Sequence, residues 1–252
     1  ITGGAKRVGA AIAMELAQQG MDIAFTYLTS ENEAHQLTHQ IQQLGRRALA
    51  IQVDLANPDA DQLIHRSFTQ HFNRLDALIN NASTFEPSPI GSITCENFDR
   101  NMAINARTPV LLIQRFADML GANFDANDPT TNPGEPGEPG VGRIVNFIDI
   151  HVLGEPLKGY LAYNASKAAL MEITSTLAIE LAPKITVNAI APGVIAWADS
   201  YTDQMKTGYM TRVPLARPGT PQDAAAAVKF LVLDAHYTTG QTLKLDGGRS
   251  LT

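Results

Sequence analysis

Cysteine, tryptophan and long apolar runs are scarce in this sequence of 252 residues. The only cysteine is Cys95, which excludes an internal disulfide framework and matches a reducing compartment. No stretch reaches the ~18 consecutive apolar residues of a transmembrane helix, and the first residues lack the charged and apolar regions of a signal peptide. We therefore expect a cytoplasmic protein without a membrane partner.

Clusters of basic residues are missing as well. The net charge is −6, and no basic cluster is longer than a pair such as Arg46 and Arg47. Because a surface that binds nucleic acid usually shows a basic patch, nucleic acid is not an expected partner. Among the six histidines only His35 and His39 have a spacing of interest, and on a polar helix they are better explained as solvated. We expect no metal site.

Apolar segments alternate with amphipathic segments along the whole chain. Strands are predicted over 21–27, 47–55, 75–82, 142–149, 185–193 and 241–248. Helices are predicted over 10–20, 30–45, 59–72, 94–120, 160–182 and 221–233. This alternation indicates an α/β fold, a single-domain, doubly wound, Rossmann-like parallel sheet of about seven strands flanked by helices. Residues 1–252 are expected to form one domain of this kind.

Two segments depart from this alternation. Only Ile1 and Thr2 precede the first glycines, whereas a buried strand takes roughly 4–8 residues, so we expect the first strand to be truncated. The stretch at about 121–142 is rich in Pro, Gly, Asn and Asp and holds too few apolar residues to order itself. It is interpreted as a flexible, solvated insertion, with a partner-binding segment as the alternative.

The opening segment "TGGAKRVG" has the composition of a phosphate-binding loop between a strand and a helix. Glycines in such a loop let backbone N–H groups and the helix dipole approach a pyrophosphate. The residues assigned to the nucleotide here are Gly3, Arg7, Val8 and Gly9. A tight turn needs glycine without any ligand too, so the position of the loop in the first βα unit is what strengthens the assignment.

The end of the second predicted strand bears on which nicotinamide nucleotide is used. An NAD enzyme typically has a carboxylate there for the ribose 2′-hydroxyl, but the sequence "TYLTS" has no acid before Glu31. Arg7, with the hydroxyls of Thr29 and Ser30, could instead bind a 2′-phosphate. NADPH is therefore favoured as the cofactor; the alternative is that Arg7 is only a solvated cation at the start of a helix.

Tyr163 and Lys167 form the candidate catalytic pair. Four residues apart on a helix, they lie on one face. A nearby ammonium group is expected to favour the phenolate and so to lower the pKa of Tyr163. Tyr163 would then be a plausible proton donor to the atom that gains charge after hydride transfer.

Four motifs in order along the chain resemble the short-chain dehydrogenase/reductase family: "TGGAKRVG", "NNAS" at 80–83, "YNASK" at 163–167 and "APG" at 191–193. The resemblance covers essentially the whole chain. It implies that Tyr163 and Lys167 are catalytic and that Asn105 orders a water beside the lysine. It also implies a homotetramer formed through helices near 105–120 and 162–182. The further nucleotide contacts that it implies are Asp54, Leu55, Asn81, Ala82, Pro192 and Gly193.

Asp149 departs from the standard pattern of that family. Carbonyl reducers of the family have a serine before the tyrosine, but no Ser or Thr occurs between Gly142 and Tyr163. An aspartate there is similar to the pteridine reductase branch, where the acid cooperates with the tyrosine in proton delivery. Asp149 lies fourteen residues before Tyr163, one more than expected, which indicates an insertion near Leu153 and Gly154.

The resemblance to that branch implies a small-molecule pterin as substrate: dihydrobiopterin, dihydromonapterin or dihydrofolate. Phe85, at the end of "NNASTF", would stack on the pterin, with packing in the core as the alternative. The substrate-binding residues assigned in this way are Ser83, Phe85, Tyr160 and Trp197. Two other functions stay open: a carbonyl reductase, for example of 3-oxoacyl thioesters, and a nucleotide sensor without catalytic activity.

Overall fold

Six strands form a two-stranded and a four-stranded parallel sheet in the computed structural model, which describes residues 1–122, 141–197 and 201–252. β1 (Ile23–Tyr27) pairs with β2 (Ala48–Gln52). The other four strands pair in the order β3-β4-β5-β6. Their bounds are Ala77–Asn80, Gly142–Phe147, Ile185–Pro192 and Thr242–Leu245. Every pairing is parallel, as the alternation of strands and helices predicts.

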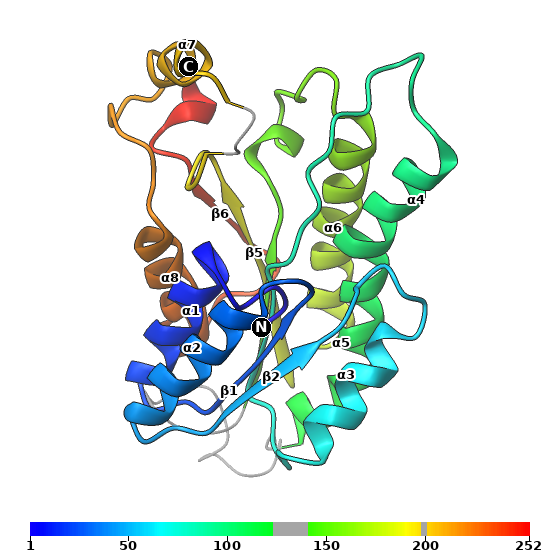
Figure 1. Ribbon diagram of the computed structural model, residues 1–252, viewed down its shortest axis with the longest axis vertical. Coiled ribbons are helices and arrows are strands. Elements are labelled where there is room, and N and C mark those ends of the chain that lie inside the picture. The colour runs from blue at the N-terminus through cyan, green and yellow to red at the C-terminus, as the bar shows by residue number, and fades with distance from the viewer. Residues whose placement is uncertain (123–140, 198–200) are drawn as a thin grey trace.

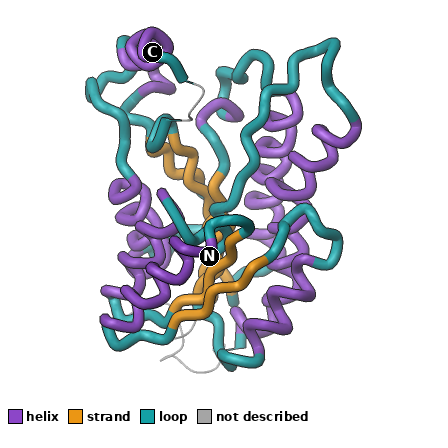
Figure 2. Tube along the Cα trace, viewed as in Figure 1, coloured by secondary structure: helices purple, strands orange, loops and turns teal. Residues whose placement is uncertain are grey.

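Helices cover both faces of the sheet (Figures 1 and 2). One layer consists of α1 (Arg7–Gln18), α2 (Glu31–Gln43) and α8 (Pro221–Lys229). The opposite layer consists of α3 (Ala60–Thr69), α4 (Cys95–Met102), α5 (Thr108–Gly121) and α6 (Leu161–Glu180). Buried side chains such as Ile12 on α1 and Phe116 on α5 fill a core on each face. The doubly wound Rossmann-like fold class is thereby confirmed.

The first residues of the chain join the two groups of strands. Thr2 N donates to Ile79 O on β3 at 2.9 Å, and Thr26 N on β1 donates to Ile1 O at 3.0 Å. The backbone at Ile1 and Thr2 thus bonds to both neighbours as a strand would, although it is too short to count as one. The described residues contain six strands rather than the expected seven, because the seventh position holds only this short segment.

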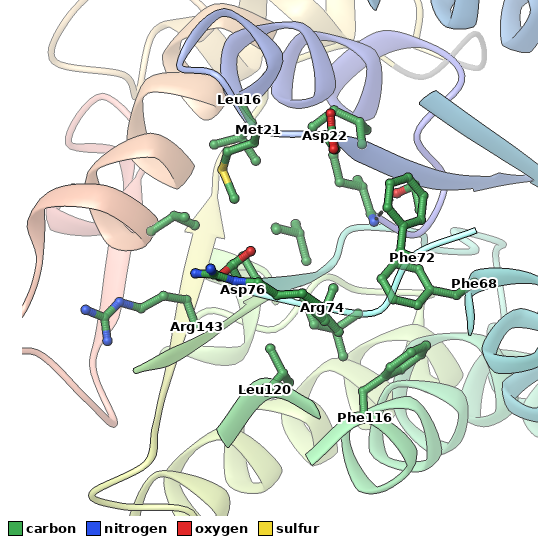
Figure 3. Close-up of a pocket in the computed structure, with 18 of the residues that line it drawn as sticks. Leu16, Met21, Asp22, Phe68, Phe72, Arg74, Asp76, Phe116, Leu120 and Arg143 are labelled. Carbon is green, nitrogen blue, oxygen red and sulfur yellow. Dashed lines mark hydrogen bonds and ion pairs between the residues drawn. The ribbon is translucent and has the colours of Figure 1, made fainter. Parts of the chain in front are cut away.

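A cavity of about 500 Å³ continues from Ile1 along the space between β1 and β3. Figure 3 shows its wall, with Leu16 and Met21 on one side and Phe116 and Leu120 on the other. The cavity lies at the amino ends of the strands. Binding sites of open α/β sheets lie at the opposite, carboxyl ends, so this cavity is separate from the candidate active site despite its size.

The helix predicted over 94–120 is interrupted by a π-helical turn, Ala103–Arg107, between α4 and α5. A further helix, α7 (Asp203–Met210), was not predicted from the sequence. It lies near the C-terminus in Figure 1. The predicted insertion at about 121–142 falls largely outside the described residues, although Gly121 ends α5 and Gly142 begins β4. In the described part of the chain no helix is both long and apolar enough to span a membrane.

Candidate active site

The glycine-rich loop lies at the carboxyl end of the sheet and leads into α1. Gly3 has a φ of 62°, which favours glycine. A side chain at Gly9 would overlap the carbonyl oxygen of Gly3, and one at Gly4 would lie 2.5 Å from the Cβ atom of Phe25. These glycines are required by close backbone approach. They leave the N-terminus of α1 accessible to a phosphate, so the loop fits a dinucleotide.

Arg7 begins α1 in a left-handed backbone conformation, with a φ of 52°. This conformation favours glycine and costs other residues roughly 1–2 kcal/mol. Arg7 is exposed and lies next to the phosphate-binding end of the loop. An arginine is therefore present where the backbone would favour glycine. This is what we would expect of a cation that is retained to bind an anionic ligand.

The other residues predicted to bind the nucleotide line the same edge of the sheet. Thr29 is exposed and Ser30 is buried immediately before α2. Asp54 follows β2, accepts a hydrogen bond from Ala56 N at 2.8 Å and forms an ion pair with Arg100 at 3.6 Å. The neighbouring Leu55 carbonyl oxygen accepts from the Thr108 hydroxyl at 2.7 Å.

The segment after β3 supports the glycine loop. The amide of Asn81 donates to the carbonyl oxygens of Thr2 at 2.9 Å and Gly3 at 3.1 Å. Ala82 N donates to the Thr2 hydroxyl at 3.0 Å. Asn81 and Ala82 therefore hold the loop in place through hydrogen bonds. The predicted contacts after β5 are Pro192, its last residue, and Gly193, whose N–H donates to Leu245 O at 3.0 Å.

Tyr163 and Asp149 form a direct hydrogen bond. The Tyr163 hydroxyl donates to Asp149 Oδ2 at 2.6 Å, so the extra residue in the intervening loop does not displace the acid. Tyr163 is buried in the first turns of α6. Burial and the negative charge of Asp149 raise the pKa of Tyr163 well above its ordinary value. The expectation of a lowered pKa for Tyr163 is wrong for this structure, because desolvation and the carboxylate of Asp149 raise it.

Lys167 lies one turn further along α6 and is almost completely buried. Its ammonium group donates to the carbonyl oxygen of Phe147, the last residue of β4, at 2.6 Å. Burial lowers the pKa of Lys167 to about 8, while Asp149 acts in the opposite direction. The ammonium lies 6.0 Å from the centre of the Tyr163 ring.

Asn105 lies in the π-helical turn between α4 and α5 and connects two parts of the site. Its amide donates to the Ser166 hydroxyl at 2.9 Å and to Thr84 O at 3.2 Å. Its oxygen accepts from Thr84 N at 3.0 Å. These bonds join the segment after β3 to α6. The hydrogen bonds of Asn105 to Thr84 and Ser166 thus give it a positioning function. The function predicted from the resemblance was to order a water.

Aromatic side chains pack beside the Tyr163 ring and in the segment after β5. Phe85 stacks on Tyr160 with ring centres 4.4 Å apart and an angle of 14° between the planes. Phe85 also meets Tyr163 edge-on at 4.8 Å. Trp197, after β5, contacts Tyr209 of α7 with the ring centres 5.6 Å apart. Ser83 is exposed, and its hydroxyl donates to Thr84 O at 3.2 Å.

Two further tyrosines belong to this site but carry no signal in the sequence. Burial raises the pKa of Tyr201, and the charges of Tyr160 and Asp149 raise it further. Burial also raises the pKa of Tyr209, which the charge of Arg249 partly opposes. Both lie in or beside α7, whose position over the sheet no local pattern predicts. The described residues contain no group of His, Cys, Asp or Glu that could hold a metal ion.

A parallel α/β sheet with a glycine-rich loop and a Tyr–Lys pair at its carboxyl edge defines an oxidoreductase of the nicotinamide-dependent type. The family model described as "Enoyl-(Acyl carrier protein) reductase" matches residues 3–250. The chain belongs to the short-chain dehydrogenase/reductase family.

Relatives and solved structures match nearly the full chain. The 3-oxoacyl-[acyl-carrier-protein] reductase of Synechocystis sp. is 33% identical, over 98% of this chain and 94% of the relative. A short-chain dehydrogenase from Burkholderia cenocepacia in complex with NADP has a TM-score of 0.85 and 33% identity, covering 99% of this chain and 96% of its own. A blue fluorescent protein from a metagenomic library in complex with NADPH has a TM-score of 0.84 and 34% identity, and the match covers 99% of this chain and 96% of that protein's chain.

Proposed function

We propose that this protein is an NADPH-dependent pteridine reductase that reduces a C=N bond of a dihydropterin. The observation that carries the proposal is the hydrogen bond of 2.6 Å between the Tyr163 hydroxyl and Asp149 Oδ2. A carboxyl group beside a phenol suits proton delivery to a ring nitrogen. No serine or threonine occupies the segment in which carbonyl reducers of the family have one.

NADPH is the proposed cofactor, bound at the glycine-rich loop. Arg7, Thr29 and Ser30 would bind the 2′-phosphate, and the loop glycines would bind the pyrophosphate. The solved structures of two related proteins, one in complex with NADPH and one with NADP, support this proposal. The remaining predicted contacts are Val8, Asp54, Leu55, Asn81, Ala82, Pro192 and Gly193.

When bound, the reduced nicotinamide supplies a hydride to the carbon of the C=N bond. The raised pKa of Tyr163 keeps its hydroxyl protonated at neutral pH. This hydroxyl can therefore give its proton to the ring nitrogen, and Asp149 can return a proton to it from solvent. The product is the tetrahydropterin. Lys167, held by the Phe147 carbonyl, would balance the negative charge that forms on Tyr163 during the transfer.

A flat, aromatic substrate suits the side chains around Tyr163. Phe85 and Tyr160 present parallel rings, and Phe85 reaches Tyr163. A pterin stacked on one of these rings would have its C=N bond near the proton donor. Ser83 and Trp197 would complete the substrate site.

Carbonyl reduction of a 3-oxoacyl thioester is the second candidate, which the name of the Synechocystis relative favours. That reaction commonly uses a polarising hydroxyl donor, and loss of one such donor costs on the order of a hundredfold in rate. A nucleotide sensor without turnover is the third candidate. The buried Tyr163, Lys167 and Asn105 argue against it, since nucleotide binding alone does not need them.

Substrate assays with two variants test the proposal. NADPH oxidation is measured with dihydrobiopterin, dihydrofolate and an acetoacetyl thioester, using the wild type, Asp149→Asn and Asp149→Ser. We expect turnover of the pterins, a loss of about a hundredfold in kcat for Asp149→Asn, and gain of thioester activity for Asp149→Ser. Thioester turnover by the wild type with inert pterins would contradict the proposal. Binding of NADPH without any turnover would support the sensor.

The protein is further proposed to be a cytoplasmic homotetramer. Pairing through helices near 105–120 and 162–182 would use α6, which exposes Leu161 and Ile179. An exposed large apolar side chain is more stable when a second chain covers it. The single cysteine supports the proposed location.

A further inference from the structure

The loop that carries Asp149 needs anchors outside itself. It runs from the end of β4 to the start of α6 and contains only a short 3-10 turn, Ile150–Val152. Gly154 and Gly159 have φ values of 140° and 82°, so the backbone turns sharply at both. Gly159 O accepts from Ser88 N at 2.7 Å, which fixes the far end of the loop. The middle of the loop depends on side-chain contacts.

A chain of hydrogen bonds leads from Asp149 to Glu155 within this loop. Asp149 Oδ1 accepts from His151 N at 2.8 Å, while its Oδ2 accepts from Tyr163. The His151 ring contacts the backbone oxygen of Glu155 through Nδ1 at 2.7 Å. Because a carbonyl oxygen can only accept, Nδ1 must carry the proton. The orientation of His151, and with it the turn at Asp149, is therefore fixed by the position of Glu155.

Two arginines from outside the loop hold Glu155. Its Oε2 accepts a hydrogen bond from Arg212 at 2.7 Å and forms an ion pair with Arg249 at 3.1 Å. The two differ in environment, because the side chain of Arg249 is 4% exposed and that of Arg212 is 51% exposed. Glu155 is itself 55% exposed, so solvent partly screens both pairs, but the buried guanidinium of Arg249 is the more costly of the two to leave unpaired.

Arg249 also contacts the aromatic wall of the active site. Its guanidinium lies 5.5 Å from the centre of the Tyr209 ring, and Tyr209 in turn contacts Trp197. Figure 1 shows the end of the chain beside α7, which carries Tyr209. Arg249 thus bonds to the Asp149 loop on one side and packs on α7 on the other.

We propose that Arg249 is a positioning residue for Asp149, acting through Glu155 and His151. The inference rests on the proposed function, in which Asp149 shares the transferred proton with Tyr163. Arg249 does not itself reach the reacting atoms. It sets the position of the loop, so that Asp149 Oδ2 stays within hydrogen-bonding distance of the Tyr163 hydroxyl. A displacement of about 1 Å at such a contact can cost up to about a hundredfold in rate.

Steady-state kinetics of matched variants test the inference on the full chain. Arg249→Met is expected to lower kcat by about tenfold or more with the KM for NADPH within about twofold of wild type. Arg249→Lys, which keeps the charge, should recover most of kcat. Arg212→Met removes the exposed partner of the same carboxylate oxygen and is the control, with kcat within about twofold of wild type. If Arg249→Met does not fold, Glu155→Gln replaces it in the test, because this position is exposed. Glu155→Gln should show the same loss of kcat.

The Asp149→Asn background separates positioning from general damage. If Arg249 acts through Asp149, Arg249→Met or Glu155→Gln should have little further effect on kcat there, because the carboxyl group whose position they disturb is already absent. If the loss of kcat in the double variant equals the product of the losses in the two single variants, the inference is overturned and the proposed function still stands. Equal losses in Arg249→Met and Arg212→Met would overturn it as well. Unchanged kcat in Asp149→Asn alone would overturn the proposed function and this inference with it.

Discussion

At the scale of single residues, Arg7 shows the clearest conflict between backbone and side chain. Its φ of 52° favours glycine, which would relieve a strain of roughly 1–2 kcal/mol. The sequence alone indicates only that a cation interrupts a glycine loop. The structure adds that this cation lies in an unfavourable backbone conformation, which supports a function in binding.

Arg7→Gly is predicted to separate stability from cofactor preference. Thermal unfolding should occur at the same or a higher temperature, because the strain is removed. The KM for NADPH should rise about tenfold to a hundredfold, since a charge-assisted hydrogen bond contributes ~1.5–3 kcal/mol. The KM for NADH should change little. Lys6→Gln removes the neighbouring exposed cation and is the control; an equal effect of both variants would refute a specific phosphate contact.

Lys167 is predicted to give the activity an alkaline limit. Its pKa of about 8 means that the ammonium is present below this pH and lost above it. We expect kcat/KM to fall as the pH rises through about 8. In Asp149→Asn this alkaline decline should begin at a lower pH, since Asp149 acts to raise the pKa of Lys167.

Unfolding does not offer an alternative explanation for this limit. Between pH 8 and 10.5 the unfolded lysine binds more protons than the folded one, so this group makes the protein more stable as the pH rises. Circular dichroism at each pH checks that the fold persists. A rate that stays constant up to pH 10 would contradict the prediction.

At the scale of elements, the first residues of the chain share the space between β1 and β3 with a cavity. Thr2 and Ile1 hydrogen-bond to both strands, and the cavity of about 500 Å³ continues their line. Its wall contains large apolar side chains, such as Phe116 and Leu120 on α5, together with charged ones such as Arg74 and Asp76. An extended apolar segment could add ladder hydrogen bonds and bury its side chains there.

An extension at the N-terminus tests whether this space accepts a strand. Six alternating Val and Ile residues before Ile1 should raise the melting temperature relative to six Gly and Ser residues at the same place. In a protein of this size each kcal/mol of added stability raises the melting temperature by about 2–4 °C. Differential scanning calorimetry measures the difference. Equal melting temperatures would mean that the cavity does not accept a strand.

The elements also differ in how well local sequence predicts them. The pattern for α1 is strong because one face of the helix is buried, and β4 stands out as a short apolar run because the whole strand is buried. The π-helical turn at Ala103–Arg107 has no such pattern, yet it places Asn105 between Thr84 and Ser166. α7 was missed because none of its residues is fully buried, so its sequence carries no clear apolar face.

At the scale of the whole molecule, the proposed homotetramer is open to direct measurement. Light scattering after gel filtration should give four times the 27.1 kDa of one chain. Ile179→Lys is expected to shift the protein toward smaller species if α6 lies in an interface, because a charge would replace an exposed apolar contact. Lys184→Gln is a surface control on the segment after α6. A monomer at micromolar concentration would contradict the proposal.

The sequence by itself determined the alternation of strands and helices, the glycine loop, and the spacing of Tyr163 and Lys167, because local periodicity and steric limits govern these features. Only the tertiary structure decided that Asp149 reaches the Tyr163 hydroxyl, and that burial raises the pKa of Tyr163 where an ammonium one turn away suggested the opposite. The position of Arg249 beside Glu155 was likewise set by the fold. Desolvation and contacts between distant segments depend on the complete packed molecule, and no local pattern encodes them.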